Sequence, residues 1–234
     1  MRARGYALLV ALYAPLLNIR PTPQPAPVTC PKRPLLHCIY LQTAWSNVTG
    51  WQLQKIVCES RRLGVAPPAS AQLQYSLLER NVELELVAVC AAEGVALLPW
   101  SPLKGGWLAG KHSREAPAPG SRVESSEKTG VVLQSHPNFS AKAADEMTWR
   151  VLDALRDIAA ATGATQSQVA LGWLLAKKAV ASVVVGAKNV DQLKDNLGAK
   201  TLGTEHVAAL DTASALPKPY PYEMIARVNM TRQR

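Results

Sequence analysis

Apolar and polar positions in the middle of the chain follow two periods, one typical of strands and one typical of amphipathic helices. Short apolar runs predict strands at residues 41–46, 69–74 and 95–100. Apolar residues spaced by three or four predict helices at residues 51–63 and 82–93. Gly64 and Gly94 follow these helices, at the position where a glycine commonly ends a helix. The order strand, helix, strand, helix, strand predicts parallel strands joined by helical crossovers.

The second half of the chain begins with a long irregular stretch and then returns to the same pattern. Residues 101–141 are rich in Gly, Pro and Ser, so a functional or disordered loop is expected there. Helices are predicted at residues 147–160, 165–178 and 189–198, and a buried strand at 181–185. Thr165 and Gln168 have the spacing of a capping box. Gly186 is expected to open a turn, and Thr204 to cap a last helix.

These elements predict an α/β fold with four parallel strands. An open doubly wound sheet and a barrel both fit such a pattern. A complete eight-stranded barrel takes about 250 residues, whereas residues 45–234 supply four strands. We therefore expect a partial (β/α)8 TIM barrel, about half of one, with a long loop and extra helices.

Residues 1–44 differ in composition and are expected to be a separate, poorly ordered segment. Arg2 and Arg4 precede an apolar run at 5–17 that is similar to a secretory signal, but no small-x-small cleavage site follows it. A run of about 13 residues is too short to span a bilayer of about 30 Å as a helix. The many prolines of residues 20–34 favour an extended linker. A cytoplasmic protein is expected, with the secretory pathway as the alternative.

The net charge of +9 does not indicate a nucleic-acid partner once its distribution is considered. Residues 1–44 contain five basic residues and no acidic one, so the other 21 basic and 17 acidic residues leave a charge of only +4. No basic run is interleaved with aromatic residues, and no zinc spacing occurs. Neither nucleic acid nor a membrane is expected as a partner. A pocket for an anionic cofactor accounts for the mild excess.

The four cysteines are too few and too irregular in spacing to form a disulfide framework, and none belongs to a CxxC pair. They are interpreted as free thiols. Cys58 and Cys90 fall on the apolar faces of predicted helices, where both are expected to be buried.

Ligands of parallel α/β proteins bind at the carboxyl ends of the strands, so the residues there are the candidates for chemistry. They include neutral hydrogen-bonding side chains, an aromatic ring and a lysine, a set that suits a nicotinamide dinucleotide. Each has an ordinary explanation when taken alone. Asn47 is more often a helix cap, Trp100 more often a core residue, and Lys188 more often a solvated charge.

Four sequence motifs favour a cofactor-binding role for these residues over the ordinary explanations, because the motifs occur together and in one order. They are SNVTGWQL at residues 46–53, QLQYSLLER at 72–80, LPWSPL at 98–103 and GAKNVDQLKDNL at 186–197. In this order they resemble the fifth to eighth strand ends of aldo-keto reductases. The resemblance extends from about residue 45 to 227. It is strongest to the branch that includes potassium-channel beta subunits and related bacterial oxidoreductases, and it implies the C-terminal half of such a barrel.

The resemblance also implies a site for NADP(H) and no metal. Ser46, Asn47 and Gln72 would bind the nicotinamide carboxamide, and Trp100 would stack on the ring. The phosphates and the adenosine end would be bound by Ser101, Leu103, Lys111, Arg122, Gly186, Lys188, Gln192 and Asn196. Lys188 is expected near the 2′-phosphate, which favours NADP over NAD.

Two residues depart from the family pattern. Val48 stands where a Phe is usual, and Lys104 stands where a small residue is usual in the phosphate loop. Lys104 would either add a phosphate contact or obstruct that loop, and the sequence does not decide between these outcomes.

A larger departure concerns proton transfer. In the family a Tyr donates a proton to the carbonyl, a Lys and an Asp tune its acidity, and a His orients the substrate. None of these four motif positions occurs in the 234 residues, and Tyr40 and His37 lie in other contexts. No catalytic residue is therefore assigned.

Two functions remain open for the chain. The first is NADPH-dependent reduction of aldehydes or ketones by a divergent or truncated form of the family, with a small carbonyl compound as substrate; the sequence does not decide whether residues 1–44 are an alternative start. The second is a non-catalytic NADP-binding protein that regulates or binds a partner. The open edges of a half barrel predict a homo-oligomer in either case.

Overall fold

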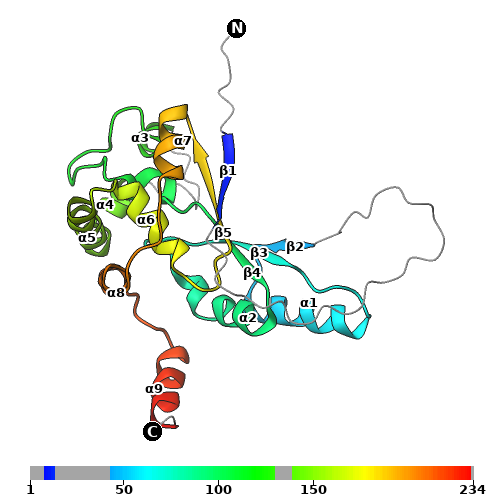
Figure 1. The fold of residues 1–234 in the computed structure, drawn as a ribbon. Helices are drawn as coiled ribbons and strands as arrows, with labels where there is room; N and C mark the ends of the chain where they lie inside the picture. The colour runs from blue at the N-terminus through cyan, green and yellow to red at the C-terminus, as the bar shows by residue number, and fades with distance from the viewer. Residues whose placement is uncertain (1–7, 14–42, 130–138, 233–234) are drawn as a thin grey trace, which may run out of the picture.

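The computed structural model of the chain describes residues 8–13, 43–129 and 139–232 (Figure 1). A parallel three-stranded sheet has the order β2 (Ala44–Ser46), β3 (Ser70–Gln74) and β4 (Ala96–Trp100). Helices α1 (Gly50–Arg62) and α2 (Leu86–Glu93) form the crossovers between these strands. The predicted alternation of parallel strands and helices is therefore confirmed for this part of the chain.

Strand β5 (Ser182–Ala187) follows next to β4. The backbone N–H of Leu97 donates to the Ala179 carbonyl at 2.8 Å, and that of Ala181 donates to the Leu97 carbonyl at 3.1 Å. The sheet does not close on itself among the described residues. The structure thus confirms a mixed α/β fold with a parallel sheet, and the partial barrel stays a prediction.

A strand that the sequence pattern did not predict lies against the far edge of β5. Strand β1 (Leu8–Tyr13) pairs antiparallel with β5, from Leu8 opposite Ala187 to Tyr13 opposite Ser182. The expectation that Gly186 opens a turn is wrong. Gly186 lies opposite Leu9 within this ladder, and the antiparallel pairing extends β5 beyond its predicted end.

Local signals account for most of the helix ends. The capping box predicted from Thr165 and Gln168 begins α6 (Gln166–Leu175), and Asp145 caps α5 (Glu146–Thr162) through the Met147 N–H. Gly64 and Gly94 adopt φ near +70° after α1 and α2, as predicted for helix-ending glycines. Helix α7 (Val190–Leu197) follows β5. Gly203, and not the predicted Thr204, is the N-cap of α8 (Thr204–Ala213).

The prediction of a single helix at residues 82–93 is wrong, because two separate helices occupy this segment. A short 3₁₀ helix, η1 (Asn81–Glu83), precedes α2, and Glu85 between them has non-helical backbone angles. The Glu83 carboxylate accepts hydrogen bonds from Tyr75 and Arg80. These contacts tie Glu83, the last residue of η1, to the loop after β3.

The irregular loop expected at residues 101–141 contains three helical segments. They are η2 (Lys104–Ala109), α3 (Arg122–Thr129) and α4 (Phe139–Ala143), and residues 130–138 lie outside the described part. Buried Trp107 organises this region, with its ring 5.6 Å from Phe139 and 4.8 Å from His112. The sequence pattern did not predict this packing, because the few large apolar side chains are scattered among many Gly and Pro residues and show no period.

The core lies on one side of β3 and β4, because buried and half-buried residues alternate along both strands. Ala71, Leu73 and Leu97 are buried with Leu53 and Val57 of α1. The residues between them along the strands point to the other face of the sheet.

The two described cysteines differ in burial. Cys90 is buried as expected, and burial raises the pKa of its thiol to about 11. Cys58 is exposed, which corrects the prediction that both were core residues, because it lies beyond the edge of the buried face of α1.

Helix α9 (Tyr222–Arg232) was also not predicted, and its first residue contacts the start of α2 through a 2.8 Å hydrogen bond from Tyr222 to Glu85. Within the described ranges, no helix has both the length and the apolar character needed to cross a membrane.

Candidate functional site

The carboxyl ends of β2, β3 and β4 bring the predicted nicotinamide residues into one row. Ser46 lies opposite Gln72 in the parallel ladder, and its hydroxyl donates to the Gln72 carbonyl at 2.9 Å. Gln74 lies opposite Trp100 one step further along the strands. Gln72, Gln74 and Trp100 share the face of the sheet that is opposite the core. The structure therefore places amide, hydroxyl and indole groups on one accessible face.

The residues that follow two of these strands have unusual backbone conformations. Asn47 follows β2 with φ of 53°, and Ser101 follows β4 with φ of 54°. A non-glycine residue with positive φ costs free energy, and such residues often mark a functional site. Both belong to the predicted cofactor set. The chain leaves each strand by a sharp turn here, and Asn47 is exposed at its turn while Ser101 is half-buried.

Trp100 differs from an ordinary core tryptophan. Its side chain is half-buried, and its indole Nε1 is buried without a hydrogen-bond partner among the described residues. The indole Nε1 of the fully buried Trp107 likewise has no partner among the described residues, so the unpaired donor alone does not mark Trp100 as a ligand contact. What distinguishes Trp100 from Trp107 is its partial exposure at the end of β4, on the face opposite the core.

A second group of predicted residues lies around the start of α7. The Lys188 N–H donates to Oε1 of Gln192 at 2.9 Å, and the Lys188 ammonium donates to the Gly120 carbonyl at 3.1 Å. An Arg122 guanidinium nitrogen lies 4.0 Å from the position a Cβ would take on Gly186. Two cationic side chains thus lie near the end of β5, where they can pair with phosphate groups.

The remaining predicted residues are placed less distinctively. Leu103 is half-buried before η2, Lys111 is exposed between η2 and α3, and Asn196 is buried on α7. No described contact ties Lys111 or Asn196 to the two groups above, so their roles stay predictions.

The Lys104 side chain points away from the predicted phosphate site and forms an ion pair with Glu79 of another loop. Its side chain is 5% exposed, and its ammonium forms an ion pair with Glu79 at 3.0 Å. Glu79 also accepts from the Asn81 amide at 2.7 Å. Lys104 has φ of 46°, and Gly105 and Gly106 after it also have positive φ. The loop after β4 is therefore fixed to the loop after β3 by a partly buried ion pair.

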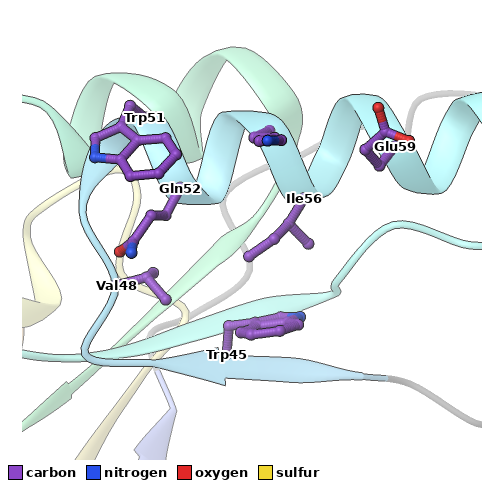
Figure 2. A pocket seen from close by; sticks show the side chains of 7 residues that line it. Trp45, Val48, Trp51, Gln52, Ile56 and Glu59 are labelled. Carbon is purple, nitrogen blue, oxygen red and sulfur yellow. The ribbon is translucent and has the colours of Figure 1, made fainter.

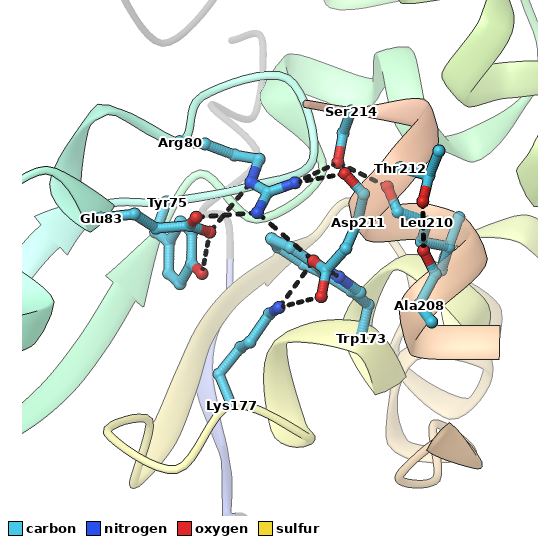
Figure 3. A network of polar contacts seen from close by, with 10 residues as sticks. All are labelled: Tyr75, Arg80, Glu83, Trp173, Lys177, Ala208, Leu210, Asp211, Thr212 and Ser214. Atoms are coloured by element: carbon cyan, nitrogen blue, oxygen red, sulfur yellow. Dashed lines mark hydrogen bonds and ion pairs between the residues drawn. The ribbon is translucent and has the colours of Figure 1, made fainter. Parts of the chain in front are cut away.

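A polar network behind the strand ends was not predicted from the sequence (Figure 3). Arg80 donates to Glu83, to the Asp211 carbonyl and to the Ser214 hydroxyl. Asp211 accepts from Trp173 at 3.0 Å and forms an ion pair with Lys177 at 2.7 Å. The network joins the loop after β3 to α6 and α8. The only trace of this network in the sequence was the spacing of Arg80 and Glu83, three residues apart, which suits an ion pair.

Tyr75 lies in the same network and is 1% exposed. Its hydroxyl donates to Glu83 at 2.6 Å. Burial, together with the Glu83 carboxylate, raises the pKa of the Tyr75 phenol far above its ordinary value. Tyr75 is therefore a structural hydrogen-bond donor and is unsuited to giving up a proton near neutral pH.

The donor set as a whole fits a dinucleotide. Amide and hydroxyl groups and an indole ring lie at one end, and Lys188 and Arg122 lie at the other. Trp100 and the left-handed Asn47 belong to the first group, and the left-handed Ser101, predicted to contact phosphate, directly follows Trp100. The described residues contain no cluster of His, Cys, Asp and Glu that would hold a metal ion.

Comparison with known proteins gives a consistent result. A model described as "Aldo/keto reductase family" matches residues 41–215. An uncharacterized oxidoreductase, YrpG, of Bacillus subtilis is 31% identical over 157 residues, which are 66% of this chain and 42% of that protein. A chloroplastic pyridoxal reductase of Arabidopsis thaliana is 33% identical over 190 residues, which are 80% of this chain and 46% of that protein.

A third relative carries a different kind of name. A probable voltage-gated potassium channel subunit beta of Oryza sativa is 29% identical over 153 residues, covering 64% of this chain and 44% of that protein. The chain spans less than half the length of each of these three relatives.

Proposed function

Because the chain belongs to the aldo/keto reductase family, we propose that it binds NADP(H) along the carboxyl ends of β2, β3, β4 and β5. The observation that carries the proposal is that Ser46 lies opposite Gln72, while the half-buried Trp100 lies two residues further along, opposite Gln74, on the same face of the sheet. The four strands correspond in this proposal to the second half of a (β/α)8 barrel.

The strand-end residues would hold the nicotinamide. The side chains of Ser46, Asn47 and Gln72 supply donors and acceptors for a carboxamide, and the half-buried Trp100 ring supplies a flat apolar surface. When bound, the cofactor supplies a hydride for reduction of an aldehyde or ketone to an alcohol. Fixing the ring against Trp100 orients it and excludes water from one side.

The groups near α7 would hold the phosphates. The Lys188 ammonium donates to the Gly120 carbonyl and has no carboxylate partner among the described residues, so its charge is available to an anion. Arg122 lies near Gly186, where the absence of a side chain leaves room for a ligand. These cations favour NADPH, which carries an additional phosphate, over NADH.

Catalysis requires a proton donor beside the carbonyl oxygen. Tyr75 does not serve, because it is buried against Glu83 on the core side. Relatives whose names denote oxidoreductases favour reduction. The relative named as a channel subunit favours the second candidate, a non-catalytic NADP-binding protein with a regulatory role.

One experiment with two measurements tests both candidates. Titration of the purified chain with NADPH, followed by tryptophan fluorescence, is expected to show saturable quenching, with an affinity about tenfold higher than for NADH. Unchanged fluorescence together with no heat of binding contradicts the cofactor proposal. The second measurement mixes the same protein with NADPH and nitrobenzaldehyde. Oxidation of NADPH supports the reductase, and binding without oxidation supports the regulatory alternative.

A further inference from the structure

An apolar groove lies at the opposite edge of the sheet from β5, between β2 and α1 (Figure 2). Its volume is about 380 Å³, and the residues that line it are Trp45, Val48, Trp51, Gln52, Lys55, Ile56 and Glu59. Ile56 points from α1 toward the ring of Trp45 on β2. Trp45 is 44% exposed and Trp51 is 64% exposed. Trp45 and Trp51 are both exposed and line the same groove as Ile56, and exposed aromatic residues of this kind mark an interaction surface.

The strand that borders this groove is an edge strand. Ala44–Ser46 pairs with β3 on one side, and its other side has no strand partner within the described part of the chain. An edge strand presents free backbone N–H and C=O groups, which commonly pair with another chain. The groove and the edge are adjacent, so one partner can cover both.

The charges at the groove point to a particular partner. Lys55 and Glu59 are one helical turn apart on α1, and both line the groove. Lys55 has no ion pair among the described residues, and Glu59 pairs only with Arg62 at 2.7 Å, where both side chains are about half exposed or more. A two-fold axis places each copy of a patch against itself, so that residue i meets residue j and j meets i. A patch with one positive and one negative charge is complementary to a second copy.

We propose that this groove is a two-fold interface between two copies of the chain. Strand β2 pairs antiparallel with β2 of the second copy, which joins the two sheets. The two α1 helices then run antiparallel across the junction, with Trp45 and Ile56 packed between them. Lys55 of each copy faces Glu59 of the other. The proposal uses no residue of the cofactor set except Ser46, whose backbone belongs to β2, and it does not depend on cofactor binding.

Charge reversal tests this arrangement. The wild-type chain is expected to be a dimer by size-exclusion chromatography with light scattering. Lys55→Glu places two glutamates of each copy against two of the other, and Glu59→Lys does the same with lysines. Because two pairs change from attraction to repulsion, each single variant is expected to raise the dimer Kd about tenfold or more.

Mixing the two single variants is the decisive measurement. A heterodimer of Lys55→Glu with Glu59→Lys restores both opposite-charge pairs, so dimers are expected to reappear in the mixture. The double variant is expected to dimerise by itself. Lys178→Glu is the matched control, since Lys178 is an exposed lysine without an ion pair among the described residues. This control is expected to remain a dimer.

Three results overturn the proposal. They are a monomeric wild type at concentrations of tens of micromolar, dimers that persist in both single variants, and single-variant monomers that do not combine on mixing. Far-UV circular dichroism of each variant separates loss of the interface from loss of the fold, because Lys55 and Glu59 are surface residues whose exchange leaves the core unchanged.

Discussion

The ammonium of Lys104 lies 3.0 Å from Oε2 of Glu79, and this ion pair joins the turn after β4 to the turn after β3. The turn after β4 contains Ser101, which is proposed to line the pyrophosphate, and the turn after β3 follows the strand that contains Gln72 of the proposed nicotinamide site. A lysine that looked in the sequence like a phosphate ligand or an obstruction is thus a brace between loops. Loss of Lys104 is therefore expected to lower the stability of both turns.

Lys104→Met is expected to lower the free energy of unfolding by about 2–3 kcal/mol, because it leaves the Glu79 carboxylate partly buried without its cation. Urea denaturation measures the change. Lys128→Met removes an exposed ion pair with Glu124 and is expected to change stability by less than about 0.5 kcal/mol. Equal effects for the two variants would show that the Lys104 pair is not a brace.

Trp100→Ala is expected to weaken NADPH binding about tenfold, because it removes the ring proposed to stack on the nicotinamide. Isothermal titration calorimetry measures the affinity without relying on tryptophan fluorescence. Tyr220→Ala removes an aromatic residue that is 81% exposed and is expected to leave the affinity unchanged. An unchanged Kd for Trp100→Ala contradicts the stacking assignment.

Lys188→Met is expected to reduce the affinity for NADPH about fivefold to tenfold and to leave that for NADH nearly unchanged, since the proposed contact is to the additional phosphate. The preference for NADPH should also become less sensitive to salt. Lys178→Met serves as the control for the loss of one positive charge. A parallel loss of affinity for both cofactors would place Lys188 at the shared pyrophosphate instead.

The sequence predicted the repeating parts of the fold because their signals are local. Alternating apolar runs located β2, β3 and β4, and glycines or capping boxes located the ends of α1, α2 and α6. The segment after β4 was not predicted, because its order comes from the packing of Trp107 with Phe139 and Trp149, which lie far away in sequence.

The sequence predicted which positions belong to the candidate site. It did not predict which of their side chains contact one another. Motif order located Ser46 and Gln72, and the parallel register then placed them side by side. The direction of Lys104 was not predictable, since it depends on the left-handed turn at that residue and on Glu79 in another loop. Contacts between distant loops are tertiary information that no local pattern carries.

Stability is expected to fall as the pH drops below about 6.5 because of His112. Burial lowers the pKa of His112, and its Nδ1 accepts a hydrogen bond from the Ala118 N–H at 3.0 Å. The unfolded chain therefore binds a proton more readily than the folded chain, so acid favours unfolding, by at most about 1.4 kcal/mol per pH unit. Above the unfolded pKa the contribution is constant.

The His112 prediction is checked by urea unfolding at pH 7.5, 6.5 and 5.5. His112→Gln is expected to be less stable at pH 7.5 and to lose part of the slope below pH 6.5. His206→Gln changes a histidine that is 29% exposed beside Glu205, and it should keep the slope. If both variants retain the full slope, another group controls the acid response.

Asp211→Asn is expected to destabilise the chain by about 1–3 kcal/mol, because Asp211 lies between two cations. Its carboxylate is 2.7 Å from the Lys177 ammonium and 3.4 Å from the Arg80 guanidinium, and it also accepts from the Trp173 indole. Loss of the charge leaves both cations close together over Trp173. Asp153→Asn breaks an exposed pair with Arg156 and is expected to cost less than about 0.5 kcal/mol. Since the network joins α6 and α8 to the loop that follows Gln74, Asp211→Asn should also increase hydrogen exchange in that loop, whereas Asp153→Asn should not.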